Sequence, residues 1–429
     1  MWQHGVRQRL ANHLQAGTTE AAGVGVVGTN PTSSVQRLSV RDTYLNPNRD
    51  NVAHQAPHLL VPSALLPPGH AISGELPSSK TPIFAYRSRT GEVRAYLNRC
   101  RHRGSQLIKC ATNPHEPIGV GRRVVCPYHS WTYDADSGRL VGVPGQEMGF
   151  PCLNKADYGL SPVPVAESAG GIFVGGEVMR NKRLWATEEV HSELDPILGG
   201  DSKQQQGKDQ SALIAYKEWD LKSNWQLVVE TFLEAYHVSS LHSNTLNLVA
   251  HSNIMATDTL DDERNFRMTV PLKNFDVECA GRRGDLSLVD FLGQTTNNYF
   301  IFPNVAVTLF KRFVLYLSIT PKSSNESLVR AWGVKHNFSS EHDSPIRSGD
   351  NNAADIRDYN AVIAGIEEDW LCSEGIQRGL EGFRGNSISM AEDPPAFTYG
   401  NFERNNILFL ENVGRAAEEL HERNDETIN

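Results

Sequence analysis

The stretches NRCRHRGS, residues 98–105, and VVCPYHSW, residues 124–131, decide the fold of this chain. Each stretch supplies one cysteine and one histidine, in the orders Cys-x-His and Cys-x2-His: Cys100, His102, Cys126 and His129. Two thiolates and two imidazoles are the ligands of a [2Fe–2S] cluster in which histidines replace the cysteines on one of the two irons. The two stretches therefore predict an iron–sulfur centre of the Rieske type.

A structural zinc site takes the same four ligand types and is the first alternative. Zinc sites usually pair Cys with Cys and His with His along the chain. Here each stretch carries one of each, which favours a cluster whose two irons are ligated differently. We therefore prefer the iron–sulfur interpretation, with a zinc-binding interaction protein as the competing hypothesis.

The composition is that of a globular chain with room for two or three domains. Of its 429 residues, 39% are hydrophobic and 21% are charged. The net charge of -9 argues against nucleic acid or an anionic membrane as the principal partner, because both attract basic surfaces. No apolar run approaches the roughly 18 residues of a membrane span. Cysteines kept as thiolates for metal indicate a reducing compartment, so we expect a cytoplasmic protein, with organelle import as the alternative.

The chain is expected to contain an N-terminal leader, a Rieske domain and a catalytic domain, at residues 1–57, 58–178 and 179–429. The middle segment has the pattern of short strands separated by turns, with a hairpin around Thr90 and Gly91. The last segment has antiparallel strand patterns between residues 298 and 334 and a helical pattern over 354–380. Strands flanked by helices, rather than alternating with them, predict an α+β fold with an antiparallel sheet in this domain.

A literal G-x-G-x-x-G occurs in the leader, at Gly23, Gly25 and Gly28. This motif binds dinucleotides only when it follows a strand and opens a helix within a βαβ unit. No strand pattern precedes it, and Pro31 follows where the helix should begin. We therefore interpret the segment as a flexible leader and expect no nicotinamide site in this chain.

A second group of metal-ligand residues lies in NWQLVVETFLEAYHVSSLH, residues 224–242. The apolar positions predict an amphipathic helix, and three polar groups lie near its apolar face: Glu230, Glu234 and His237. A buried carboxylate beside a buried imidazole is costly unless the pair is hydrogen-bonded or binds metal. His237 and His242 lie too far round a regular helix to share one ion, so we expect a π-type turn or a break near Ser239–Ser240. Two unrelated core or surface histidines are the alternative.

Both motifs resemble the Rieske non-haem iron oxygenases, the family of the aromatic-ring-hydroxylating dioxygenases, in their α or oxygenase subunit. The matching residues beside the cluster ligands are Arg101, Arg103, Gly104, Pro127, Tyr128 and Trp131. The second motif matches the family pattern Asp/Glu-x2-His-x4-His at Glu234, His237 and His242. Respiratory Rieske proteins carry an extra cysteine in each loop, where this chain has Ser105 and Tyr128.

The chain departs from the family pattern in two places. Ser130 stands where the family most often has glycine. The segment between the two ligand pairs is also longer than usual, and we expect its extra part, NPHEPIGVGRR at residues 113–123, to be a surface loop.

The resemblance implies that a third iron ligand, an aspartate, follows much later on a helix. Our candidate is Asp369 in GIEEDWLCSEGIQRGL, residues 365–380, because it shares a helical face with Gly365 and Ile376. Two imidazoles and one carboxylate form the facial triad of non-haem Fe(II) oxygenases. Four nearby acids remain alternatives for this position: Glu367, Glu368, Asp355 and Asp358.

The resemblance also implies how the two metal centres work together. The [2Fe–2S] cluster supplies electrons, and a mononuclear Fe(II) uses them with O2 to hydroxylate or oxidatively demethylate a small organic substrate. In the family, electrons cross between neighbouring subunits of a trimer, and an acid at the position of Glu234 links a cluster histidine, here His129, to His237. We therefore expect a homotrimer, with small β subunits as an open alternative, and a separate NAD(P)H-dependent reductase, with or without a ferredoxin.

The substrate class is less closely defined by the sequence. Family members with Glu at the position of Glu234 and a late ED-x2-C-x4-Q run include enzymes of quaternary ammonium compounds such as choline and betaines, and EDWLCSEGIQ resembles that group. Five aromatic residues could face such a cation: Tyr236, Trp370, Phe397, Tyr399 and Phe402. The alternative substrate is an aromatic compound that is hydroxylated, dihydroxylated or demethylated. A Rieske ferredoxin-type electron carrier is a different hypothesis, which leaves the His-His-carboxylate set unexplained.

Overall fold

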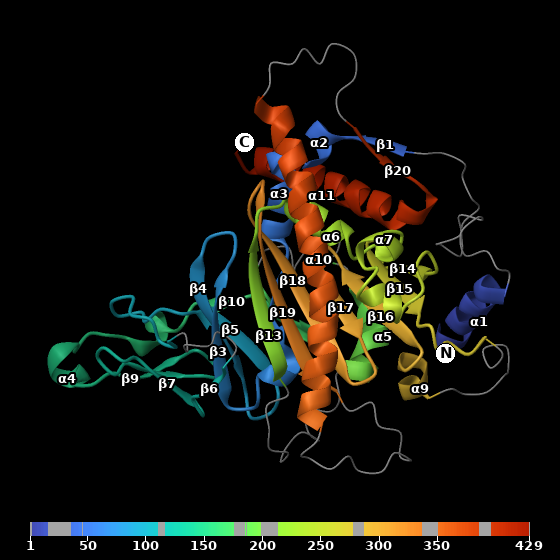
Figure 1. Ribbon diagram of the computed structural model, residues 1–429. Coiled ribbons are helices and arrows are strands. Elements are labelled where there is room, and N and C mark those ends of the chain that lie inside the picture. Colours follow the sequence, from blue (N-terminus) through green and yellow to red (C-terminus); the bar gives the residue numbers. More distant parts are fainter. Residues whose placement is uncertain are drawn as a thin grey trace. The chain divides into compact units, whose positions relative to one another are not determined.

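The computed structural model describes residues 2–15, 36–44, 46–109, 116–175, 185, 187–198, 213–277, 287–336, 351–385 and 396–428. The chain divides into two compact units (Figure 1). One consists mainly of residues 55–185, and the other of residues 213–429 together with residues 1–54. Within the described stretches, no helix combines the length and the apolar character that a membrane crossing requires.

The first unit is built almost entirely of short antiparallel strands. They are β2 (His58–Pro62), β3 (His70–Leu76), β4 (Thr81–Arg87), β5 (Val93–Leu97), β6 (Ile118–Gly119), β7 (Arg123–Val125), β8 (Thr132–Asp134), β9 (Leu140–Gly142), β10 (Pro162–Val163), β11 (Val165–Ser168) and β12 (Gly171–Val174). Their sheet orders are β10-β5-β4-β3-β6, β11-β12-β2 and β7-β8-β9. A single helical turn, α4 (Gln146–Gly149), follows β9.

The expected hairpin around Thr90 and Gly91 is confirmed, because β4 and β5 pair with Tyr86 opposite Arg94. The insert between the ligand pairs differs from the expected surface loop. Its residues Ile118 and Gly119 form β6 and pair with the start of β3, so part of the insert extends the sheet. Residues 113–115 of the insert lie outside the described stretches.

The second unit is organised around a large antiparallel sheet. Its strands are β13 (Leu213–Leu221), β14 (Ala256–Leu260), β15 (Asn265–Pro271), β16 (Thr295–Ile301), β17 (Val305–Leu309), β18 (Phe313–Ser323) and β19 (Glu326–Lys335), in the order β13-β19-β18-β17-β16-β15-β14. Every residue of β17 is buried, so both faces of the middle of the sheet are covered. The antiparallel strands expected between residues 298 and 334 are confirmed by β16, β17, β18 and β19.

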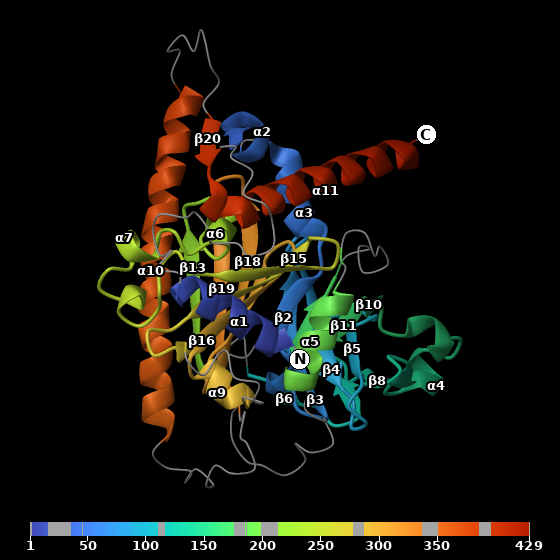
Figure 2. The same cartoon turned by 90° about the vertical axis from the view of Figure 1, so that its right-hand side faces the viewer.

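Helix α10 (Asn351–Gly385) runs along the sheet in both views (Figures 1 and 2). The unit also contains α6 (Trp225–Glu230), α7 (Val238–Leu241), α9 (Leu288–Leu292) and α11 (Arg404–Ile428), whereas most of α5 (Glu188–Leu198) falls in the first unit. Helix α10 contains the expected helix over 354–380 and contacts both β13 and α6. The α+β class is confirmed, with a β-rich first unit and a second unit that combines one large antiparallel sheet with helices.

The N-terminal segment differs from a flexible leader, because much of it belongs to the second unit. Helix α1 (Trp2–Gln15) packs on β14, and β1 (Gln36–Ser39) pairs with β20 (Ala396–Tyr399). Helices α2 (Val40–Tyr44) and α3 (Pro47–Gln55) follow. The glycines of the G-x-G-x-x-G lie outside the described residues.

Candidate metal centres and active site

The segment 224–242 forms two short helices rather than one long helix. Asn224 caps α6 by accepting a hydrogen bond from Gln226 N, and α6 ends at Glu230. Helix α7 then begins after His237 and ends before His242. The expected break near Ser239–Ser240 was wrong in its position, since these residues form α7 and the interruption precedes His237.

The interruption has a local cause in Glu234. Its carboxylate accepts hydrogen bonds from the backbone N–H groups of Tyr236 and His237, the latter at 3.2 Å. A side chain that captures backbone donors in this way competes with continuation of the helix. As a result, the single turn of α7 carries a histidine at each end.

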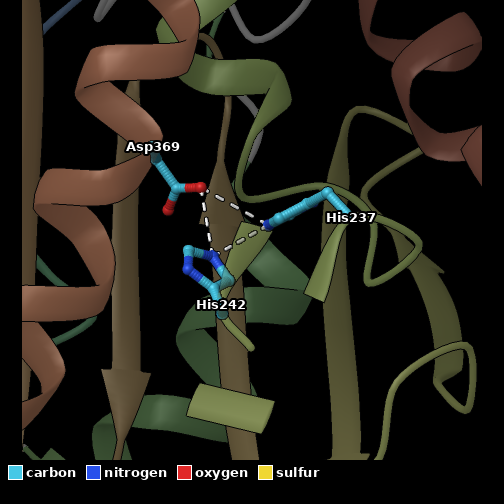
Figure 3. A group of neighbouring side chains, drawn as sticks. All are labelled: His237, His242 and Asp369. Carbon is cyan, nitrogen blue, oxygen red and sulfur yellow. Dashed lines mark hydrogen bonds and ion pairs between the residues drawn. The ribbon is translucent and has the colours of Figure 1, made fainter. Parts of the chain in front are cut away.

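The two histidines meet Asp369 of α10 at one point (Figure 3). His237 Nε2 and His242 Nε2 are 3.2 Å apart. Asp369 Oδ1 lies 3.4 Å from His237 Nε2 and 3.2 Å from His242 Nε2. Among the described residues, these three form the group whose ligand atoms are close enough to share one metal ion.

The geometry of this group fits a bound divalent cation. Three ligand atoms about 2.1 Å from an ion, at mutual angles of about 90–110°, lie about 3.0–3.4 Å from one another. Asp369 is 3% exposed, and its Oδ1 atom is buried with no hydrogen-bond donor among the described residues, although it faces both imidazoles. A buried carboxylate in that condition is costly unless a cation satisfies it.

Each imidazole of the group has a second carboxylate at its other nitrogen. Glu234 Oε1 is hydrogen-bonded to His237 Nδ1, and Glu368 Oε2 lies 2.7 Å from His242 Nδ1. Burial lowers the pKa of both histidines, but the neighbouring carboxylates outweigh it, and the net pKa of each is raised. Burial raises the pKa of Asp369. A bound cation competes with protons for the Nε2 and Oδ1 atoms, so metal binding here releases protons.

The other acids weighed for the third ligand position have partners elsewhere. Glu367 binds Lys217 Nζ at 2.5 Å and Trp219 Nε1 at 2.9 Å, both on β13. Asp355 receives the Arg312 guanidinium at 2.7 Å, and Asp358 lies 3.5 Å from Arg357. Glu368 touches the site, but through the nitrogen of His242 that faces away from Asp369. No sequence pattern predicted the contact between Glu368 and His242 Nδ1.

The four candidate cluster ligands lie on two loops of the first unit that have the same backbone design. In one loop, Cys100 N donates to Ser105 O and Gly104 N donates to Cys100 O, at 2.8 and 2.9 Å. In the other, Cys126 N donates to Trp131 O and Ser130 N donates to Cys126 O, at 2.8 and 3.0 Å. The fifth residue of each loop, Gly104 or Ser130, has a left-handed φ of 74° or 56°. The departure from glycine at Ser130 therefore puts a side chain where the backbone favours none.

The side chains of these loops converge as a [2Fe–2S] cluster requires. The rings of His102 and His129 lie 4.7 Å apart between centroids, and His102 stacks on Trp131 at 4.8 Å. Cys100 and Cys126 are both buried, and neither forms a disulfide with another cysteine in the described stretches. Burial raises the pKa of Cys126, but backbone N–H groups of Tyr128 and His129 that point at its sulfur outweigh this effect and lower the net pKa. Such donors stabilise a thiolate at this position.

A third polar cluster, around Glu230, lies at the end of α6. Tyr44 and Tyr399 donate hydrogen bonds to its two carboxylate oxygens at 2.7 and 2.9 Å, and the two hydroxyls also contact each other. Burial raises the pKa of Glu230 from its ordinary 4.5 to about 7. Tyr399 belongs to β20, so this cluster fastens the β1–β20 pair to α6.

The aromatic residues expected to face a cation have different surroundings. Tyr236 stacks on Phe402 with centroids 5.2 Å apart, and Trp370 packs edge-on against Phe232 at 5.8 Å. Phe397 packs on Tyr44, and Tyr399 is engaged with Glu230. Of these five residues, Tyr236 directly precedes His237 and Trp370 directly follows Asp369 in the chain.

Two family models match the chain. Residues 59–157 match the Rieske [2Fe-2S] domain, and residues 209–416 match the catalytic domain of the ring-hydroxylating α subunit. The chain is 33% identical over 183 residues to the glycine betaine monooxygenase oxygenase subunit of Chromohalobacter salexigens, which covers 43% of this chain and 36% of that protein. It is 29% identical over 160 residues to the biphenyl 2,3-dioxygenase α subunit of Rhodococcus jostii, covering 37% of this chain and 32% of that one. These matches thus span about a third of each relative's length.

Solved structures share the fold over nearly the whole chain. A quaternary ammonium Rieske monooxygenase, CntA, in complex with L-carnitine has a TM-score of 0.58 at 18% identity, covering 91% of this chain and 100% of its own. Naphthalene 1,2-dioxygenase from Rhodococcus sp., bound to indole, has a TM-score of 0.58 at 19% identity, covering 96% and 98%. At these identities the likeness concerns the fold alone.

Proposed function

The chain belongs to the α subunits of the Rieske non-haem iron ring-hydroxylating oxygenases, and we propose that it is the terminal oxygenase component of a multi-protein system. The proposed reaction is the hydroxylation or oxidative demethylation of a small organic substrate with O2. The observation that carries this proposal is the convergence of His237, His242 and Asp369 within 3.2–3.4 Å of one another. An electron carrier would need no such group.

In this proposal, His237, His242 and Asp369 hold a mononuclear Fe(II), and Cys100, His102, Cys126 and His129 hold the [2Fe–2S] cluster. Iron with three ligands on one face keeps positions open for O2 and substrate, and the cluster supplies the reducing equivalents that this chemistry consumes. Glu234 orients His237 through Nδ1. We assign it the further role of linking His237 to His129 of a neighbouring subunit, which requires the homotrimer.

For the substrate we propose a quaternary ammonium compound. Glu234, Glu368 and Asp369 place three carboxylates around the two histidines, so a divalent iron leaves the group with a net negative charge. A surplus of negative charge in a partly buried site favours a ligand with a cationic end. Relatives named as glycine betaine monooxygenases support the same class.

An aromatic substrate is the second candidate. It is favoured by the similarity to the biphenyl dioxygenase α subunit. Tyr236 and Trp370, which adjoin His237 and Asp369 in the chain, would suit either substrate, since aromatic faces attract both cations and other rings.

Substrate-dependent O2 uptake tests the function and the substrate class together. The purified chain, supplied with NADH and a reductase borrowed from a related system, would be screened against betaines, aromatic acids and methyl ethers. We expect uptake coupled to product with a betaine or another quaternary ammonium compound. Coupled uptake with aromatic substrates alone would select the second candidate, and a chain with two irons and no uptake would support the electron carrier.

A further inference from the structure

His242 is held between two consecutive carboxylates of helix α10. Asp369 Oδ1 lies 3.2 Å from Nε2, while Glu368 Oε2 lies 2.7 Å from Nδ1. The two nitrogens point to opposite sides of the imidazole ring. A carboxylate can only accept a hydrogen bond, so the short contact with Glu368 places the ring proton on Nδ1. Nε2 then keeps its lone pair toward Asp369 and His237.

Glu368 is itself held in place by Thr245. The Thr245 hydroxyl donates to the same Oε2 atom at 2.6 Å, and Thr245 N donates to His242 O at 3.0 Å. His242, Thr245 and Glu368 therefore form a closed hydrogen-bonded ring that includes the backbone of residues 242–245. The His242 side chain is 1% exposed, so water has little access to replace Glu368 at Nδ1.

We propose that Glu368 is a positioning residue that fixes the orientation and tautomer of the metal-binding His242, and that Thr245 fixes Glu368. This inference rests on the proposed function, because it takes His242 as an iron ligand. A carboxylate at the far nitrogen of a metal-binding histidine raises its basicity and orients its ring, and removal of such a partner costs 10–100-fold in metal affinity in other proteins.

The neighbouring Glu367 provides a matched control. It lies on the same turn of α10 and carries the same charge, but it binds Lys217 and Trp219 of β13 and does not touch His242. The substitution Glu367→Gln therefore removes a negative charge from α10 and keeps the contact between Glu368 and His242.

The test uses the full chain with its cluster in place and its mononuclear iron removed. Co(II) serves as the probe, and its visible absorption bands report both affinity and ligand geometry. We expect Glu368→Ala to weaken Co(II) binding by about 10–100-fold. Glu368→Gln should weaken it less, because its amide oxygen still accepts from Nδ1. Thr245→Val should weaken it a few-fold, and Glu367→Gln should leave it unchanged.

A second readout separates positioning from general stability. Proton NMR of the Co(II)-bound chain should show one shifted, slowly exchanging Nδ1–H signal for each of the two histidines, and Glu368→Ala should lose the slow exchange of one of them. Unchanged affinity and both protected signals in Glu368→Ala would overturn the inference. If Glu368→Ala loses the cluster absorbance, the near-isosteric Thr245→Val decides: unchanged affinity and unchanged Nδ1–H exchange there would overturn it.

Failure of the proposed function gives a different result. If the unmodified chain, with its iron–sulfur cluster in place, binds no Co(II), the histidines hold no metal and the proposed function itself is refuted. If the unmodified chain binds Co(II) and the Glu368 variants match it, the proposed function stands and the role of Glu368 does not.

Discussion

The substitution Glu230→Gln should make the stability of the second unit less dependent on pH. Glu230 is buried, and burial raises its pKa from 4.5 to about 7. Between these values the folded chain binds a proton that the unfolded chain has released, so stability falls as the pH rises through this window. The difference between the two pKa values corresponds to about 3 kcal/mol. Glutamine resembles the protonated side chain and has no proton to lose.

The assay is the thermal unfolding midpoint of both proteins from about pH 5 to about pH 8. We expect the difference between the unfolding midpoints of the variant and the unmodified chain to shift in favour of the variant by about 5–10 °C from the low to the high end of this range. This shift follows from about 2–4 °C of midpoint per kcal/mol of stability. Glu326→Gln is the control: a hydrogen bond and ion pair with Lys222 lower the pKa of this exposed group, so it titrates below the tested window. Equal pH slopes in Glu230→Gln and the unmodified chain would refute the assignment of the proton to Glu230.

Three further predictions concern the metal centres. His237→Ala should keep the visible cluster spectrum and lower the iron content from about three to about two per chain; loss of the cluster spectrum instead would contradict a separate iron site. Glu234→Gln should retain both metals and slow single turnover sharply, whereas an unchanged rate would rule out an electron path through this residue. Gly104→Ala should destabilise the cluster domain by about 1 kcal/mol, while Ser130→Gly should be neutral or slightly stabilising. The measurement is the thermal loss of cluster absorbance. Equal losses of stability in both variants would argue against strain from the left-handed backbone.

The sequence was most informative where ligands stand close together in the chain. The cysteine and histidine of each pair lie two or three residues apart, so ligand type and order along the chain indicated the kind of cofactor. A Rieske domain model matches the same region. The α+β class followed in the same way from patterns confined to single strands and helices. Register and sheet order were not predicted, because they depend on pairing between strands that are distant in sequence.

Contacts between distant segments were beyond the reach of the sequence. Glu230 was recognised only as a polar group on an apolar helix, since its partners Tyr44 and Tyr399 lie 186 and 169 residues away. From the sequence, the acids near Asp369 could be ranked as candidates for the third metal ligand only by the helical face on which each one lies. The structure places Asp369 at Nε2 and Glu368 at Nδ1 of His242, a distinction that depends on side-chain direction rather than on residue type.

Helix α10 spans Asn351–Gly385 and is about 50 Å long at 1.5 Å per residue. Because Glu368 and Asp369 are consecutive residues of one continuous helix, a single inserted or deleted residue upstream would turn both carboxylates by about 100° together. Length changes in the part of α10 that precedes Glu368 would therefore displace both carboxylates, whereas length changes in the loops would not. Diversification of such a scaffold is expected to proceed by substitution along α10 and by insertion elsewhere.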